Sequence, residues 1–155
     1  MRKQYFPARD GQPSPLRVKV KRRVRFEEVD SIGIVWHGRY ASYFEDARDA
    51  LGEKYGVSYM DFYNYGVLVP VKKMYMDYHH PLKFQDTMTI EGVLHWSEAA
   101  RLNYEFIIKN HEGRLSTTGF TVQMMLDMDK NICMIPPRFY EEFLKRWKDG
   151  ELEKD

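Results

Sequence analysis

The chain has 155 residues, of which 24 are Lys or Arg and 23 are Asp or Glu, and 43% of its residues are hydrophobic. This length suits one domain with a sizeable core, and the near balance of charge argues against binding nucleic acid through a large positive charge. Cys133 is the only cysteine, which excludes an intrachain disulfide and a cysteine-based zinc site. No stretch reaches the ~18 apolar residues of a transmembrane helix, so we expect a cytoplasmic protein with no membrane partner.

The first predicted elements are an extended arm over residues 1–15 and a strand after it. Three of the seven prolines fall in the arm, among polar residues. Apolar side chains then alternate with basic ones, which is typical of a half-buried strand. The apolar positions, with Arg22 as the one break, are Leu16, Val18, Val20, Val24 and Phe26. The basic positions of the run KVKRRVR, residues 19–25, predict one solvated face, so no nucleic-acid partner is expected.

From Tyr40 the apolar residues recur at spacings of three and four. This spacing predicts an amphipathic helix over residues 40–55, with Gly56 as its C-terminal stop. The apolar positions are Tyr40, Tyr43, Phe44, Ala47, Leu51 and Tyr55. Ser58 and Asp61 have the spacing of a capping box, which predicts a short second helix that ends at Gly66.

The rest of the chain is predicted to contain four strands and a last helix. The strand-like segments are residues 67–78, 88–96, 102–108 and 120–128, with turns at NHEG (110–113) and DMDKN (127–131). A helix is expected after Pro136 and Pro137, so that residues 16–148 form one domain before a charged tail at 149–155.

This order of elements predicts an α+β fold in which a five-stranded antiparallel sheet wraps around one long central helix. A single layer of this kind leaves the outer face and the edges of the sheet exposed. We therefore expect self-association into a homodimer or homotetramer.

The segment VRFEEVDSIGIVWHGRYASYFEDAR, residues 24–48, resembles the hotdog-fold acyl-CoA thioesterases of the 4-hydroxybenzoyl-CoA thioesterase type. The family pattern is a strand that ends in an aromatic residue, an acid-rich turn, D-x-x-G-x-V-aromatic-His/Tyr, and a helix with aromatic-Glu-x-x-Arg. The matching residues are Asp30, Gly33, Val35, Trp36, His37, Phe44, Glu45 and Arg48. The resemblance extends over residues 18–145 and implies the hotdog fold.

The resemblance also implies hydrolysis of an acyl-CoA or acyl-carrier-protein thioester, with Asp30 as nucleophile or general base. The backbone N–H near His37 would polarise the thioester carbonyl, which suits the free N–H groups and partial positive charge of a helix start. Substrate contacts are expected from Gly33, Val35, Trp36 and Tyr40, and His37 is a second catalytic candidate. No cofactor is implied, because CoA is part of the substrate.

Each of these residues also has a purely structural interpretation. Asp30 can be a turn acid or helix cap, His37 a packed histidine, and Glu45 with Arg48 a surface ion pair rather than a pocket wall. The aromatic-rich residues 58–69 can be core or the wall of an acyl pocket. Candidates for contacting CoA phosphates, by position alone, are Lys72, Lys73, Arg101 and Arg114.

A metal site is not expected, because the adjacent His79 and His80 would point to opposite faces of a strand and no H-E-x-x-H motif is present. Two other functions remain open. A hotdog hydratase would use Asp30 and His37 as a proton-transfer pair. A non-catalytic module that binds acyl-CoA or acyl-carrier protein would have little use for a carboxylate beside a thioester.

Overall fold

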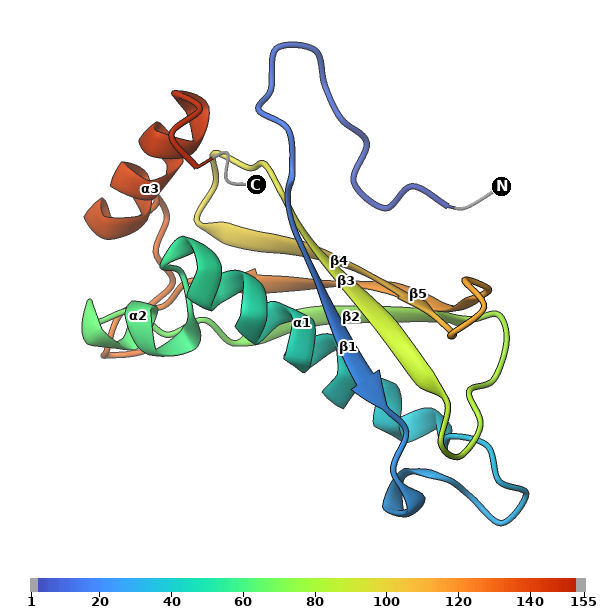
Figure 1. Cartoon of the computed structure of the whole chain (residues 1–155). Helices are drawn as coiled ribbons and strands as arrows, with labels where there is room; N and C mark the ends of the chain where they lie inside the picture. The colour runs from blue at the N-terminus through green and yellow to red at the C-terminus, as the bar shows by residue number, and fades with distance from the viewer. Residues whose placement is uncertain (1–2, 153–155) are drawn as a thin grey trace.

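Five strands form one antiparallel sheet, and helix α1 (Tyr40–Tyr55) packs along one face of it (Figure 1). The computed structural model describes residues 3–152. The strand order is β1-β3-β4-β5-β2. The strands are β1 (Leu16–Arg23), β2 (Val71–Tyr78), β3 (Thr87–His95), β4 (Arg101–Lys109) and β5 (Leu115–Met124). This arrangement confirms the predicted α+β fold, with a five-stranded sheet and one long central helix.

Helix α1 occupies the predicted span because its apolar stripe faces the sheet. Phe44 is fully buried and stacks on Phe106 of β4, with 4.5 Å between the ring centroids. Gly119 of β5 makes this approach possible, because a Cβ there would lie 2.8 Å from the Phe44 ring and would also collide with the carbonyl oxygen of Tyr75. The helix ends as predicted at Gly56, whose φ of 75° is left-handed.

The short helix α2 (Tyr59–Asn64) is capped as the sequence predicts. The Ser58 hydroxyl accepts the N–H of Asp61, and the Asp61 carboxylate accepts the N–H of Ser58 at 2.9 Å. Phe62 anchors α2 by contacting the rings of Phe139 and Tyr140 in helix α3 (Arg138–Lys148). The capping box therefore holds a helix that bridges the end of α1 and the last helix.

Three strands differ from the prediction by more than one residue at a boundary. β1 ends at Arg23 rather than Phe26, which lies in the 3-10 turn η1 (Phe26–Glu28) with 77% of its surface exposed. β2 begins only after Pro70, since proline has no N–H for the ladder. β5 begins at Leu115 and ends at Met124, because the chain leaves the sheet before the turn at 127–131.

Arg22 breaks the apolar alternation of β1 because it faces α1 and forms an ionic cluster there. Its guanidinium donates to Glu28 at 2.6 Å and to Asp46 at 2.7 Å, and it lies 4.8 Å from the centroid of the Tyr43 ring. Burial, together with the nearby Glu28 carboxylate, raises the pKa of Tyr43. The cluster joins β1, η1 and α1 immediately before the Asp30 turn.

The outer sheet face is exposed only in part, because the N-terminal arm lies across β5 and the neighbouring strand β2, whereas Arg17, Lys19 and Lys21 of β1 are exposed as expected. Tyr5 and Phe6 contact Phe120 of β5 with ring centroids 5.0 and 5.4 Å apart, and the Tyr5 hydroxyl donates to Asp77 at 2.9 Å. On the same face, Ile107 of β4 is only 2% exposed. The aromatic side chains of the arm replace the solvent that a bare outer face would contact.

The C-terminal segment also packs onto the domain. Trp147 of α3 donates its indole N–H to the carbonyl of Ser14 at 2.9 Å, and Leu152 is buried in the core. Residues 1–2 of the expected arm and 153–155 of the expected tail lie outside the described residues. Within residues 3–152, no helix is both long enough and apolar enough to cross a bilayer.

Candidate functional site

Asp30 lies in a tight turn that its own carboxylate helps to form. The N–H of Gly33 donates to the Asp30 carbonyl at 3.1 Å, and Gly33 has a left-handed φ of 80°. Asp30 Oδ1 accepts the N–H of Ile32 at 3.0 Å, whereas Oδ2 receives no hydrogen bond from residues 3–152. One carboxylate oxygen therefore fixes the turn, and the other is available to a ligand.

The chain then enters the 3-10 turn η2 (His37–Arg39), which leads directly into α1. The N–H of Trp36 donates to the backbone carbonyl of Glu28 at 2.9 Å, and the N–H of Arg39 donates to that of Trp36 at 2.9 Å. The N–H groups of His37 and Gly38, at the start of this helical segment, have no backbone acceptor in the described part of the chain. Two free donors and the positive end of the helix dipole thus follow the Asp30 turn.

A pocket of about 300 Å³, the helix-start pocket, lies beside these donors. Its lining residues are Ile34, Val35, His37, Tyr40, Tyr78, His79, His80, Pro81 and Thr117. Three sequence-predicted site residues, Val35, His37 and Tyr40, therefore come together. Asp30 is not among the lining residues, but its N–H donates to the carbonyl of Ile34 at 2.8 Å, which places its turn at the pocket's edge.

The other two predicted substrate contacts, Trp36 and Gly33, do not line the helix-start pocket. The indole of Trp36 lies against Gly38, where a Cβ would collide with the ring, and it is half exposed. The carbonyl of Gly33 accepts the N–H of Phe84 at 3.1 Å, so this glycine ties the Asp30 turn to the loop before β3.

The end of β2 supplies pocket residues that sequence reasoning missed. The Tyr78 hydroxyl donates to the carbonyl of His37 at 2.9 Å, and the Tyr78 ring packs edge-on against Tyr40 at 5.4 Å. His79 lies 3.1 Å from the Thr118 hydroxyl through Nε2. The two adjacent histidines are the available signal in the sequence, because they mark the end of β2 where it meets this pocket. Among residues 3–152, no three His, Cys, Asp or Glu side chains gather as a metal site.

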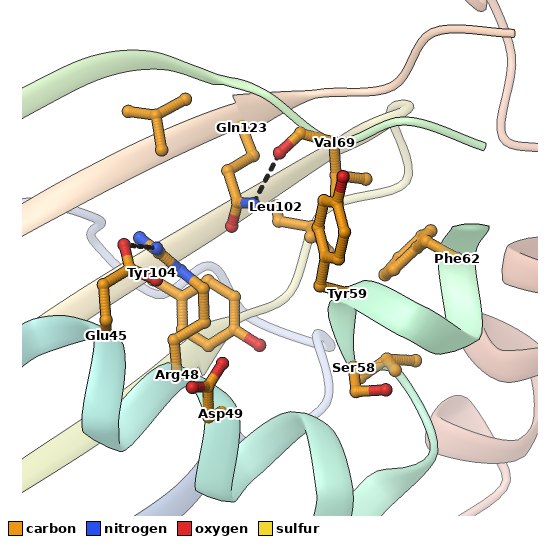
Figure 2. A pocket seen from close by; sticks show the side chains of 12 residues that line it. Glu45, Arg48, Asp49, Ser58, Tyr59, Phe62, Val69, Leu102, Tyr104 and Gln123 are labelled. Carbon is orange, nitrogen blue, oxygen red and sulfur yellow. Dashed lines mark hydrogen bonds and ion pairs between the residues drawn. The ribbon is translucent and has the colours of Figure 1, made fainter. Parts of the chain in front are cut away.

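A second cavity of about 350 Å³, the α1–α2 cavity, lies between these helices and the sheet (Figure 2). Its apolar walls come from helix α2, the connecting loops and strands β2 and β4. The lining residues are Glu45, Arg48, Asp49, Val57, Ser58, Tyr59, Phe62, Val69, Val71, Leu102, Tyr104 and Gln123. Four of them belong to the aromatic-rich segment 58–69, and Glu45 and Arg48 line this cavity rather than forming only a surface pair.

Two polar side chains of this cavity keep unused hydrogen-bonding atoms. Arg48 is only 12% exposed and binds Glu45 and the Thr121 hydroxyl, the latter at 2.6 Å, while its buried Nε has no partner in the described part of the chain. Gln123 donates to the Val69 carbonyl at 2.7 Å, and its Oε1 is likewise buried without a partner among residues 3–152. The cavity can therefore take a mainly apolar group with a polar substituent.

The acidic groups of this cavity influence one another. Burial, followed by the neighbouring Glu45 carboxylate, raises the pKa of Asp49. The Arg48 guanidinium opposes this shift and lies 5.5 Å from the centroid of the Tyr104 ring. The cavity thus contains one paired cation and no excess of positive charge that would select an anionic ligand.

The two hollows lie along opposite halves of α1. Tyr40 lines the first and Arg48 the second, and their separation of eight residues corresponds to about 12 Å along a helix. They also lie at opposite ends of β2, because Tyr78 lines the first and Val71 the second. Within one chain they are therefore separate sites.

Comparisons with known proteins agree with this architecture. Residues 24–145 match the family model described as the thioesterase-like superfamily. The chain is 30% identical over 106 residues to a putative acyl-CoA thioesterase of Bacillus subtilis, YneP, covering 68% of this chain and 77% of that protein. It is 27% identical over 105 residues to the acyl-CoA thioester hydrolase YbgC of Escherichia coli, covering 68% and 78% of the two chains.

The solved structure of a DHNA-CoA thioesterase from Staphylococcus aureus superposes with a TM-score of 0.76 at 25% identity. The match covers 90% of this chain and 97% of that one. The matched family segment contains the Asp30 turn, α1, strands β2 to β5 and both hollows. The chain therefore belongs to the thioesterase-like superfamily and is a hotdog-fold thioester hydrolase.

Proposed function

We propose that the protein hydrolyses acyl-CoA thioesters, with the reaction centre between the Asp30 turn and the start of α1. One observation carries this proposal: the Asp30 turn, whose Oδ2 has no partner within residues 3–152, adjoins the pocket that His37 lines, where the start of α1 has two free backbone N–H groups. A thioester carbonyl needs a basic or nucleophilic group on its carbon and donors on its oxygen. The names of the relatives support an acyl-CoA substrate.

The reaction balances with these groups alone. As general base, Asp30 takes a proton from water while the resulting hydroxide attacks the thioester carbon, and the N–H groups of His37 and Gly38 bind the oxyanion. The C–S bond then breaks, the thiolate accepts the proton, and a carboxylic acid and free CoA leave. As nucleophile, Asp30 instead attacks the thioester carbon, the C–S bond breaks to release CoA thiolate, and water then hydrolyses the mixed anhydride, which frees Asp30 and the acid and supplies the proton for the thiolate.

We further propose that the complete site forms between two copies of the chain. β2 is an edge strand, and its outer edge is unpaired within residues 3–152, while its side chains Met74 and Tyr78 are substantially exposed. Antiparallel pairing of two β2 edges about a two-fold axis places the start of one β2 beside the end of the other. The helix-start pocket of one protomer would then adjoin the α1–α2 cavity of its partner, which would hold the acyl group.

Thiol release from a panel of aromatic, short-chain and long-chain acyl-CoAs tests the activity. We expect turnover of at least one substrate and a loss of at least about a hundredfold in kcat for Asp30→Asn. Asp127→Asn is the matched control, because this carboxylate also accepts the N–H two residues ahead, that of Asp129, and lines neither hollow. Equal activity of Asp30→Asn and the wild type would contradict the assignment of Asp30.

One observation favours a non-catalytic binding module as the second candidate. Asp30 Oδ1 accepts the N–H of Ile32 in the manner of an ordinary turn-forming aspartate. In that case acyl-CoA would bind with no release of thiol, and Asp30→Asn would lower stability rather than a rate. A hydratase has less support, because Asp30 and His37 share no hydrogen bond within residues 3–152.

A further inference from the structure

A shallow hollow of about 590 Å³ lies at the end of β1, on the other side of the loop that ties down the Asp30 turn. We call it the basic–aromatic hollow. Its lining residues are Lys21, Arg22, Arg23, Val24, Arg25, Phe26, Phe84 and Gln85. It contains the basic run of the sequence, which the reaction centre leaves unused.

Two phenylalanine rings form the apolar part of this hollow. Phe26 and Phe84 meet edge to face with centroids 5.7 Å apart, and they are 77% and 41% exposed. An exposed pair of aromatic rings in contact forms an apolar patch, and such patches often mark binding sites. Such faces suit the stacking of a planar heterocycle.

The cations beside these rings are largely uncommitted. Arg22 is occupied by Glu28 and Asp46, but Lys21 and Arg23 have no ion-pair partner among residues 3–152. Arg25 makes only a long contact of 3.9 Å with the exposed Glu27. The acidic group of the adjoining loop, Asp86, accepts the N–H of Lys83 at 2.8 Å. Three cations therefore face solvent around two open rings, which is the complement of a phosphorylated aromatic ligand.

Hydrogen bonds join the hollow to the reaction centre. The N–H of Val24 donates to the Asp86 carbonyl at 2.8 Å, and the N–H of Phe84 donates to the Gly33 carbonyl at 3.1 Å. Ile34 of the helix-start pocket pairs with Lys83 in an isolated bridge. Figure 1 shows the end of β1, the loop before α1 and the loop before β3 gathered at the end of the molecule where α1 begins.

We propose that the basic–aromatic hollow binds the nucleotide end of coenzyme A. Adenine contacts Phe26 and Phe84, and the 3′-phosphate and diphosphate bind Lys21, Arg23 and Arg25. The inference rests on the proposed function, since it assigns the far end of the same substrate. The volume lies within the range of small-ligand sites, about 300–1,000 Å³, and a carrier protein would need a much larger flat surface.

The phosphate candidates named from sequence position have other surroundings. Arg101 donates to Asn103 at 2.8 Å, and Arg114 lies beside the turn at 110–113, where its N–H donates to Asn110. Lys72 and Lys73 lie on the edge strand β2. None of these four residues lines the basic–aromatic hollow.

The first test compares two substrates that carry the same acyl group, one on CoA and one on N-acetylcysteamine, which has no nucleotide. The ratio of interest is kcat/KM for the acyl-CoA divided by kcat/KM for the acyl-N-acetylcysteamine. In the double variant Lys21→Ala/Arg23→Ala we expect this ratio to fall about tenfold, because KM for the acyl-CoA rises. Phe26→Ala should lower the ratio and Phe26→Tyr should restore it. The control Lys145→Ala/Arg146→Ala, on exposed cations of α3, should leave the ratio unchanged.

The second test titrates adenosine 3′,5′-bisphosphate by calorimetry, which requires no hydrolysis. Binding by the wild type that weakens about tenfold in Lys21→Ala/Arg23→Ala supports the hollow even if no thioester is cleaved. Thioester cleavage with an unchanged substrate ratio overturns the hollow while the proposed function stands. Loss of activity on acyl-carrier protein alone, with acyl-CoA unaffected, would assign the cations to a protein partner and also overturn it.

Discussion

At the scale of single residues, adjacent acids have opposite roles. Glu28 is 2% exposed and binds Arg22 at 2.6 Å, and its other oxygen accepts the N–H of Arg25 at 2.8 Å. Glu27 is two-thirds exposed and makes only the 3.9 Å contact with Arg25. The sequence shows two equivalent acids followed by Val29 and Asp30. The structure separates them because only Glu28 turns inward, beneath the turn that carries Asp30.

This difference predicts unequal costs of mutation. Glu28→Gln should lower the free energy of unfolding by about 3 kcal/mol, because it leaves the half-buried Arg22 with one partner fewer. Glu27→Gln, the matched control, should change it by less than about 0.5 kcal/mol. Urea unfolding at neutral pH measures both values. Equal effects of the two substitutions would show that the Arg22 cluster does not support the turn.

Residue patterns alone predicted the elements better than the site. The period of Tyr40 to Tyr55 and the capping pair Ser58 and Asp61 predicted α1 and α2, because these signals are local. Tyr78 and Gln123 were missed, because they reach their pockets only through the pairing of β2 with β5. Arg22 appeared as a break in a strand for the same reason, since its partner Asp46 is 24 residues away.

At the scale of elements, the N-terminal arm could not be placed from its sequence. Proline and polar residues predict an extended segment but not its surface. Tyr5 fixes it, because its hydroxyl donates to Asp77 at 2.9 Å and lies 2.9 Å from the Thr118 hydroxyl. The hydroxyls of Tyr75 and Tyr5 lower the pKa of the Asp77 carboxyl. The arm thereby covers a face that the sequence alone leaves to self-association.

The docking of the arm should weaken in alkali. Burial, with the Asp77 carboxylate nearby, raises the pKa of Tyr5 to about 12 from 10.0. Because folding raises this pKa, the protonated Tyr5 hydroxyl makes its full contribution to stability below pH 10. That contribution is lost as the pH rises from 10 towards 12. The urea midpoint of the wild type should therefore approach that of Tyr5→Phe above pH 10. A difference between them that stays constant from pH 9 to 11 would contradict the role of this hydroxyl.

At the scale of the whole molecule, the arm and the edge strand favour one mode of association over another. The arm covers the outer face over β5 and β2, whereas the outer edge of β2 is unpaired within residues 3–152. Edge pairing would therefore be open to two copies, while face-to-face contact would first require the arm to leave. This favours a homodimer over a homotetramer, and in such a dimer the two hollows of different protomers would be neighbours.

Mixing two inactive variants tests this shared site most directly. Asp30→Asn removes the carboxylate, and Leu102→Trp fills the α1–α2 cavity, so each homodimer should be inactive once sedimentation shows that it has formed. Random exchange gives one intact site in half of the dimers, so thiol release should recover to about a quarter of the wild-type rate. If the carboxylate and the cavity served one chain, no mixed dimer would contain an intact site, and mixing would recover no activity.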